Sequence, residues 1–435
     1  MPRVKIPFNY TPRTYQLPLW EAMDGGIKRA VVVWHRRSGK DKTLINLMVS
    51  KAVERVGAYY YFFPTYKQGK KILWDGRDRD GFKFLDHIPV EIRKRSNDTE
   101  LKVELVNGSI IQIIGTDNID SIVGTNPVGC VFSEYALQDP QAWSFIRPIL
   151  AENGGWAVFN YTPRGNNHGK RIYDLAVESE SWFAQKLTVD DTGVIPVDVL
   201  ENEKKEMFAQ TGNDSLYEQE YMCSFDVPVQ GAYYGQQLVE AEKDNRVTRV
   251  PYDPSLPVHT AWDLGIGDSN AIWFLQTVGQ EIRVIDYYET NGESMAYYVK
   301  YLQEKKYVYG NHYAPHDIEV RELSTGKTRK ETASSLGINF VVAPRIPVDD
   351  GIDAVRNLLN KCWFDKEACE RGLDALKSYH KVFDEDNQMY KNRPEHDWSS
   401  HGADAFRTFA VSYVQEVAQS MPPPLKVSYD ETIGI

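Results

Sequence analysis

The stretch WHRRSGKDKT, residues 34–43, combines the residue types that a phosphate-binding loop requires. Such a loop is a turn from a strand into a helix, where backbone N–H groups face the phosphates and a lysine reaches the β and γ oxygens. The apolar run AVVVW precedes the turn, which contains Gly39 and Lys40. Trp34 stands in place of the first glycine, and Asp41 in place of the Ser or Thr that binds Mg²⁺. The loop residues predicted to bind ATP are Arg36, Arg37, Ser38, Gly39, Lys40, Asp41, Lys42 and Thr43.

A second apolar run, VGCVFSE (128–134), ends in Ser133 and Glu134. This layout is typical of a Walker B strand, whose glutamate activates the attacking water. Ser133 stands where an aspartate is usual, so a carboxylate has moved to the loop and a hydroxyl to the strand. We hypothesise that Asp41 and Ser133 jointly hold Mg²⁺, directly or through water, because this hard ion accepts oxygen ligands of either kind. The alternative leaves Asp41 as a residue favoured by the helix dipole and assigns the ion to Thr43.

Further polar residues of the first half could complete a nucleotide site. TPRTYQ (11–16) offers a platform that could stack on adenine and read its edge, through Arg13, Tyr15 and Gln16. NYTPRG (160–165) ends another apolar run with groups that could sense the γ-phosphate. Candidate arginine fingers are Arg36 and Arg37, either of which could equally form a salt bridge or touch DNA, and Arg147 is a further candidate.

Three aspartates of the second half fit a two-metal phosphodiesterase. Such hydrolysis needs three or more carboxylates around two ions that lie about 3.5–4 Å apart. Asp263 in TAWDLG is predicted on a strand, Asp317 in YAPHD at the end of a later strand, and Asp404 in HGADAFR on a helix. A helix carboxylate that packs on a sheet is costly to bury unless it is paired or metal-bound. We therefore predict that these three aspartates bind the metal ions and are catalytic.

Weaker candidates surround this triad, and each of them also fits a helix cap or a surface polar group. They are Asp268, Asp286 and Glu289 as a fourth ligand, and His316, Asp397 and His401 around the ligands. The insertion STGKTRKET between the second and third aspartates is predicted to form a hairpin or loop. Its Lys327, Arg329 and Lys330 could bind the DNA backbone by neutralising phosphates.

The order of the expected strands and helices that position these residues differs between the two halves of the chain. Strand-like runs alternate with helical segments in the first half, at 30–34, 58–64, 109–115, 128–134 and 155–163. This predicts an α/β domain with a mostly parallel sheet, whose ligands bind at the carboxyl ends of the strands. The second half begins with consecutive strands, followed by a helix near 294–305 and helices after residue 350, which predicts a ribonuclease-H-like mixed sheet.

Domain boundaries follow from a proline-rich stretch without periodic pattern. We predict a P-loop ATPase domain at 1–225, a linker at 226–256, a nuclease domain at 257–420 and a tail at 421–435. A chain of 435 residues is too long for one ordinary core, and four scattered cysteines without a CxxC pair suggest neither a zinc site nor a disulfide framework. The net charge of −11 leaves local basic patches free to bind DNA. No signal sequence or run of about 20 apolar residues is apparent, so we expect a cytoplasmic protein.

In the order of these motifs the chain resembles the large terminase subunit of tailed double-stranded DNA bacteriophages, a motor and nuclease that packages viral genomes. The order is RxYQ, a deviant Walker A, PTY at 64–66, Walker B with its glutamate, and TPRG, followed by the acidic triad. By this resemblance Lys40 binds phosphates, Glu134 is the catalytic carboxylate, and the segment from Asn160 to Thr162 couples hydrolysis to movement.

The resemblance also implies the cofactors and partners. The cofactors are ATP and Mg²⁺, with Mn²⁺ as an alternative at the nuclease site. The partners are double-stranded DNA, a portal protein and a small terminase subunit, and several copies form a ring only when docked. The expected location is the host cytoplasm and, transiently, the portal vertex of the procapsid, not the mature virion.

Two other functions compete with this interpretation. A helicase-like DNA translocase would share the adenine motif and the Walker residues, but it would not explain the acidic triad. A non-enzymatic scaffold would explain the two altered motif positions, but not the retention of Lys40, Glu134 and all three aspartates.

Overall fold

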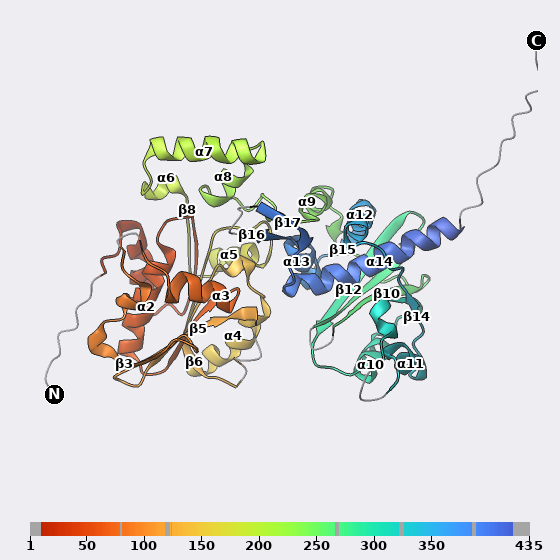
Figure 1. Cartoon of the computed structure of the whole chain (residues 1–435), viewed down its shortest axis with the longest axis horizontal. Helices are drawn as coiled ribbons and strands as arrows, with labels where there is room; N and C mark the ends of the chain where they lie inside the picture. The colour runs from red at the N-terminus through yellow and green to blue at the C-terminus, as the bar shows by residue number, and fades with distance from the viewer. Residues whose placement is uncertain are drawn as a thin grey trace, which may run out of the picture. The chain divides into compact units, whose positions relative to one another are not determined.

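The computed structural model describes residues 10–78, 81–117, 122, 124–265, 269–321, 326–384 and 389–420. The chain divides into two compact units, Met1–Gln230 and Gly231–Ile435 (Figure 1). Asp268 and the tail at 421–435, both singled out in the sequence, lie outside the described residues. None of the helices that the structure describes is both long and apolar enough to span a membrane.

A mostly parallel sheet forms the middle of the first unit. Its strands are β1 (Arg29–Trp34), β2 (Ala58–Phe63), β3 (Arg93–Asn97), β4 (Lys102–Leu105), β5 (Ile110–Gly115), β6 (Pro127–Ser133), β7 (Trp156–Tyr161) and β8 (Trp182–Leu187). They lie in the order β3-β4-β5-β2-β6-β7-β1-β8. The pairs β3–β4 and β4–β5 are antiparallel, and the other pairs are parallel. Because parallel neighbours end at the same edge, the residues that follow β1, β6 and β7 meet there.

The central strands of this sheet are apolar on both faces, so each face carries a core. Along β1, Val32 and Trp34 pack in one core with Leu44, whereas Val31 and Val33 pack in the other. This alternation follows from the two-residue period of a strand. The helices are α1 (Leu17–Asp24), α2 (Lys40–Glu54), α3 (Tyr66–Gly69), α4 (Gln141–Asn153) and α5 (His168–Glu178).

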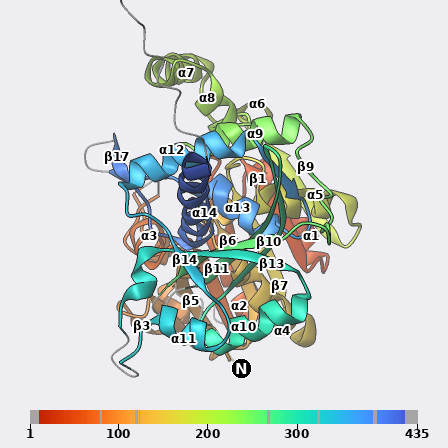
Figure 2. The same cartoon turned by 90° about the vertical axis from the view of Figure 1, so that its right-hand side faces the viewer.

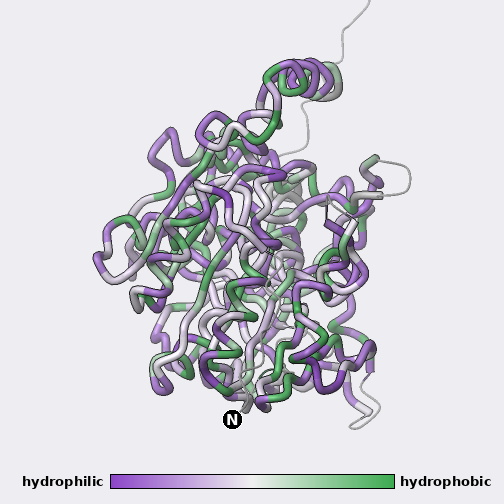
Figure 3. Tube along the Cα trace, turned by 90° about the vertical axis from the view of Figure 1, so that its left-hand side faces the viewer, coloured by the Kyte–Doolittle hydropathy of each residue, from purple (hydrophilic) through white to green (hydrophobic). Residues whose placement is uncertain are grey.

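A helical segment follows β8 and has a small core of its own. It consists of α6 (Val189–Thr192), α7 (Val197–Thr211) and α8 (Ser215–Glu220). Its core contains Val189, Leu200 and Tyr221. Figure 3 shows hydrophobic and hydrophilic residues mixed along α7, the helix at the top of that view.

The second unit contains a mixed sheet. Its strands are β9 (Val247–Thr248), β10 (Val258–Leu264), β11 (Asn270–Val278), β12 (Glu281–Thr290), β13 (Tyr309–Ala314), β14 (Phe340–Val342) and β15 (Cys362–Asp365), and a separate hairpin is formed by β16 (Lys381–Asp384) and β17 (Met389–Pro394). The sheet order is β14-β13-β10-β11-β12-β15-β9. The strands β10, β11 and β12 are antiparallel neighbours, whereas β13 runs parallel to β10.

Helices also cover both faces of this mixed sheet. They are α9 (Gly235–Lys243), α10 (Met295–Lys305), α11 (Arg329–Ser335), α12 (Val348–Leu359), α13 (Glu370–Ser378) and α14 (Trp398–Ser420). The long helix α14 crosses one face of the sheet (Figure 2) and packs on β10, β11 and β13. Its Phe406 and Ala410 are fully buried in that core, and Tyr413 packs against it.

The α/β class is confirmed, with a mostly parallel sheet in the first unit and a mixed sheet in the second. The prediction of a hairpin or loop for the basic insertion is wrong in its second half, where α11 begins at Arg329. Thr328 caps this helix, because its Oγ1 accepts from Glu331 N at 3.0 Å while Glu331 Oε2 accepts from Thr328 N at 2.8 Å. This reciprocal capping box stabilises a helix start.

Candidate nucleotide site and carboxylate cluster

The predicted phosphate-binding loop connects β1 to α2. Gly39, the last residue before α2, has a φ of 84°, in the left-handed region that favours glycine. Lys40 is buried, and its Nζ donates to the carbonyl oxygens of Trp34 and His35 at 3.0 and 3.3 Å. The same ammonium donates to Thr162 Oγ1 at 3.0 Å. The lysine therefore joins the end of β1 to the residue that follows β7.

Asp41 and Ser133, the two residues of the exchange hypothesis, are in direct contact. Ser133 Oγ donates to Asp41 Oδ1 at 2.7 Å. Asn160 Nδ2 donates to Ser133 Oγ at 3.2 Å and to Asp41 Oδ1 at 3.5 Å. Thr43, the alternative ligand, is fully buried, and its hydroxyl lies 2.8 Å from Tyr10 OH. The carboxylate of the loop, rather than the threonine of the helix, therefore contacts the end of β6.

Tyr61 of β2, which belongs to none of the sequence motifs, also contacts Asp41. Its hydroxyl donates to Asp41 Oδ1 at 2.8 Å, and its ring is fully buried. Burial and the negative charge of Asp41 raise the pKa of this phenol well above its ordinary value, so Tyr61 stays protonated and donates. Three tyrosines follow one another at 59–61, and only the pairing of β2 with β6 identifies the one that contacts the loop.

Glu134 follows β6 directly and has a φ of 55°, which few residues other than glycine adopt. Burial raises the pKa of its carboxyl, whereas the charges of Lys40 and Arg164 lower it. Its Oε2 is buried without a hydrogen-bond partner among the described residues, and so is Asn160 Oδ1. Oxygen atoms of this kind beside a lysine fit hydrated Mg²⁺ and a water molecule that must lose a proton.

The residues predicted to read adenine contact the backbone of the loop. Tyr15 OH and Gln16 Nε2 donate to the carbonyl oxygen of Ser38 at 2.6 and 3.2 Å. Arg13 Nη1 donates to Tyr15 OH at 2.8 Å. The buried Gln16 accepts from Tyr10 OH at 2.7 Å through its Oε1. Protein atoms therefore engage both the oxygen and the nitrogen of the Gln16 amide, and the three residues hold the loop in place.

The remaining residues of the predicted site differ in exposure. Ser38 is buried, and its Oγ has no partner within the described part of the chain. Lys42 Nζ forms a 2.8 Å ion pair with Asp78 Oδ2. Arg147 is exposed on α4, far along the chain from the loop.

One of the two loop arginines, Arg36, lies beside a buried glutamate, Glu220. Arg36 Nη1 lies 3.8 Å from Glu220 Oε2, and its side chain is 56% exposed. Arg37 is exposed and has a φ of 69°. Glu220 is also paired with Arg164, which belongs to the TPRG motif. The partner of Arg164 lies on α8, 56 residues away in the sequence.

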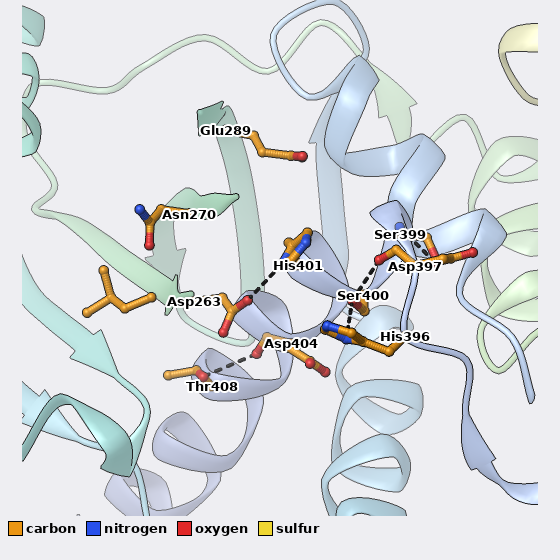
Figure 4. Close-up of polar contacts among 12 residues, drawn as sticks. Asp263, Asn270, Glu289, His396, Asp397, Ser399, Ser400, His401, Asp404 and Thr408 are labelled. Atoms are coloured by element: carbon orange, nitrogen blue, oxygen red, sulfur yellow. Dashed lines mark hydrogen bonds and ion pairs between the residues drawn. The ribbon is translucent and has the colours of Figure 1, made fainter. Parts of the chain in front are cut away.

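Asp263, Asp317 and Asp404 come from three different elements of the second unit. Asp263 lies in β10, Asp404 in α14, and Asp317 in a short 3₁₀ helix, His316–Glu319, that follows β13. Figure 4 shows Asp263 on its strand beside Asp404 on the helix. Burial and the negative charge of Asp263 raise the pKa of both other carboxyls, and that of Asp404 rises to about 6. Asp263 therefore lies close enough to Asp317 and to Asp404 to act on both carboxyls electrostatically.

Two of these carboxylates have protein partners. Arg407 Nη1 forms a 2.9 Å ion pair with Asp404 Oδ1, and Tyr379 OH donates to the same oxygen at 3.2 Å. His401 Nδ1 lies 3.4 Å from Asp263 Oδ2 (Figure 4). Among the described residues, no three His, Cys, Asp or Glu side chains are arranged to hold a metal ion together as they stand. Mutually repelling carboxylates nevertheless fit a hard divalent ion, which would replace Arg407 as the counter-ion of Asp404.

The candidates for a fourth ligand lie on opposite faces of the sheet. Glu289 shares a face with Asp263, because both are in register with Ala271 on the strand between them. Its carboxylate accepts from Tyr287 OH at 2.5 Å and pairs with an arginine at 3.0 Å. Asp286 lies on the other face, in register with Phe274, and is paired with a lysine of α10. Asp286 is therefore remote from the cluster.

The candidates around the ligands also differ. Asp397 caps α14, since its Oδ1 accepts from Ser399 N at 2.9 Å and from Ser399 Oγ at 2.5 Å. His316 is exposed next to Asp317. His401 contacts a proposed ligand, because its Nδ1 lies 3.4 Å from Asp263 Oδ2.

The three basic residues predicted to bind DNA lie at the start of α11. Lys327 is exposed. Lys330 Nζ forms a 2.8 Å ion pair with Glu319 Oε1. Arg329 Nη1 donates to the carbonyl oxygen of Leu264 at 2.8 Å, one residue after Asp263. Arg329 therefore contacts the end of the strand that carries the first aspartate.

Known proteins that are similar to this chain include large terminases. No family model matches the chain. The terminase large subunit of Escherichia phage T5 is 24% identical over 325 residues, which cover 72% of each chain. Among solved structures, the ATPase domain of the large terminase of Thermus phage P74-26 is 19% identical, with a TM-score of 0.41, over 50% of this chain and 95% of that one. The nuclease domain of the P22 large terminase is 15% identical, with a TM-score of 0.30, over 39% of this chain and 89% of that one.

The alignment with the T5 terminase covers most of each chain, so it includes more than either predicted site alone. Its match confirms the resemblance of this chain to the large terminase subunits of tailed bacteriophages.

Proposed function

We propose that this chain uses ATP hydrolysis to move double-stranded viral DNA into a procapsid and cuts concatemeric DNA at a metal-dependent nuclease site. The observation that carries the proposal is the convergence of Lys40, Asp41, Ser133 and Glu134 at one edge of the first sheet. The relationship to the T5 terminase supports the same function.

In the first unit, each residue has a role that its contacts support. Bound ATP with Mg²⁺ would supply the phosphate bond to be cleaved and the cation that offsets its charge. Lys40 would hold the phosphates, and Asp41 with Ser133 would hold the cation. Glu134 would accept a proton from water at Oε2, which suits a carboxyl whose pKa burial has raised.

Asn160 and Thr162 would couple the site to the rest of the unit. Thr162 accepts from Lys40 Nζ, and Asn160 donates to Ser133 Oγ. Both therefore contact a residue that would hold phosphate or cation, and a change at either contact would be transmitted to the chain after β7.

In the second unit, Asp263, Asp317 and Asp404 would hold divalent ions for phosphodiester hydrolysis. Two such ions would activate a water molecule and stabilise the leaving oxygen. His401 would orient Asp263, which it contacts at 3.4 Å. The substrate would be double-stranded DNA, and the partners a portal protein and a small terminase subunit, with several copies acting together at the portal vertex.

Two variants test the two activities separately. The unaltered protein should hydrolyse ATP with Mg²⁺ and cleave plasmid DNA with Mg²⁺ or Mn²⁺. Glu134→Gln should abolish hydrolysis and leave plasmid cleavage intact, and Asp263→Asn should do the reverse. Loss of both activities in either variant, with both proteins folded, would count against two independent sites.

A further inference from the structure

Glu220 is a buried carboxylate that binds arginines from two separate parts of the nucleotide site. Its side chain is 5% exposed and is paired with Arg164 of the TPRG motif. Arg36 of the phosphate-binding loop lies 3.8 Å away, and its backbone N–H donates to the Glu220 carbonyl at 2.8 Å. A buried carboxylate is costly unless it is paired in this way.

The helical segment Val189–Glu220 is attached to the loop at both of its ends. At its start, His35 Nε2 lies 2.7 Å from Thr192 Oγ1. At its end, Glu220 binds the loop and the TPRG motif. Between these ends the segment packs mainly on its own small core. A displacement of either arginine would therefore act directly on α8.

Arg164 is connected to the loop through its chain neighbour and through Glu220. It lies two residues after Thr162, whose Oγ1 accepts from Lys40 Nζ at 3.0 Å, and it is paired with the same glutamate that Arg36 of the loop approaches. Arg164 is 18% exposed, whereas Arg36 is 56% exposed and lies farther from Glu220. Arg164 is thus held more firmly than Arg36.

We propose that Arg164 contacts the terminal phosphate of ATP from within the same subunit and that Glu220 is its positioning residue. A guanidinium has five N–H donors in a planar fork, so it can bind a carboxylate and a phosphate at once. The presence or absence of the third phosphate is thereby transmitted through Glu220 to the helical segment. This inference rests on the proposed ATPase function. It adds a specific residue, Arg164, that distinguishes ATP from ADP by contacting the third phosphate.

The test is the affinity of the full chain for AMP-PNP and for ADP, measured by titration calorimetry in Mg²⁺. Arg164→Ala should weaken AMP-PNP binding about tenfold or more and change ADP binding less than about twofold, since a charge-assisted hydrogen bond is lost only with the third phosphate. Arg164→Lys should fall between, because an ammonium lacks the fork that bridges two anions.

Glu220→Gln should lower the ratio of AMP-PNP to ADP affinity about threefold or more. The ratio is the quantity to compare, because removal of one negative charge acts on both nucleotides in the same direction. In the Arg164→Ala background, Glu220→Gln should change the ratio no further. Glu218→Gln is the matched control, since Glu218 lies on the same helix and forms no ion pair among the described residues.

Each other outcome counts against the proposal. Equal weakening of both nucleotides by Arg164→Ala, or an unchanged affinity ratio in Glu220→Gln, would overturn the assigned roles while leaving the ATPase function standing. Failure of the unaltered chain to bind either nucleotide would overturn the proposed function and this inference with it. Circular dichroism and melting curves identify a variant that has not folded, and the more conservative Arg164→Lys and Glu220→Asp then replace it in the same measurement.

Discussion

Ser133 Oγ donates a 2.7 Å hydrogen bond to Asp41 Oδ1 across 92 residues of sequence. The contact arises because β6 lies two strands from β1 in a parallel sheet, so that its end meets the loop after β1. A hydroxyl on the strand and a carboxylate on the loop supply the oxygens that the usual pattern supplies in the opposite arrangement. The two departures from that pattern are therefore neighbours in space.

Removal of the Asp41 carboxylate should weaken the dependence on magnesium. We expect Asp41→Ala to raise the Mg²⁺ concentration for half-maximal ATP hydrolysis about tenfold or more, because a direct or water-mediated ligand is lost. Asp41→Ser should show a smaller increase, since it restores a hydroxyl. The measurement is the ATPase rate against free Mg²⁺. Thr43→Val is the control, because Thr43 is bonded to Tyr10, and a larger effect there would favour the alternative ligand.

Removal of the Tyr61 hydroxyl should also change the Mg²⁺ dependence of ATP hydrolysis, but less than removal of the Asp41 carboxylate. Tyr61→Phe deletes the 2.8 Å hydrogen bond to Asp41, and we expect it to lower the free energy of unfolding by about 1 kcal/mol. It should also raise the Mg²⁺ requirement, because Asp41 is then less well oriented. Tyr60→Phe is the matched control on the same strand, since Tyr60 packs in the opposite core. Equal Mg²⁺ dependence of the two variants would exclude a positioning role for Tyr61.

The carboxylate cluster should destabilise the metal-free chain at neutral pH. The pKa of Asp404 is about 6 in the folded chain, above its ordinary value, so the folded chain binds this proton more tightly than the unfolded chain. Protonated Asp404 therefore contributes to the free energy of unfolding. This contribution is fully present below about pH 4 and is lost as the pH rises through about 6. Ionised Asp263 is one cause, and its removal should relieve the repulsion.

We accordingly expect Asp263→Asn to raise the melting temperature in EDTA at pH 7.5 by about 2–4 °C, and by less at pH 5. Mn²⁺ or Mg²⁺ should raise the melting temperature of the unaltered chain but not that of the variant. Scanning calorimetry of the full chain at both pH values gives these shifts. A variant that is less stable than the unaltered chain at pH 7.5 would contradict the repulsion between these carboxylates.

The sequence predicted those features that depend on local pattern. Buried parallel strands are continuous apolar runs, so AVVVW identified β1, and the residues after β6 and β7 followed from the same rule. The exchange of Asp41 and Ser133 was a hypothesis from two motif positions, and the structure places these residues in contact. Lys40, Glu134 and Thr162 are at the same edge of the sheet because their strands are parallel neighbours.

Features that depend on register or on distant pairing could not be predicted in this way. Tyr61 is one of three consecutive tyrosines, and its contact with Asp41 requires the alignment of β2 with β6. Arg164 and Glu220 are 56 residues apart, and α8 has no motif that would identify the partner. The helix α11 could have been recognised, since Thr328 and Glu331 have the spacing of a capping box.

We expect two basic residues of the insertion, Lys327 and Arg329, to have different roles. Lys327 is exposed, so Lys327→Ala should weaken DNA binding and reduce the slope of log affinity against log salt by about 1, the value for one phosphate contact. Arg329 donates to the Leu264 carbonyl beside Asp263, and its charge lowers the pKa of Asp317. Arg329→Ala should therefore slow plasmid cleavage with a small change in the salt slope. Fluorescence anisotropy with duplex DNA from 50 to 200 mM salt, in EDTA, measures the slope, and equal slopes for both variants would contradict the separation.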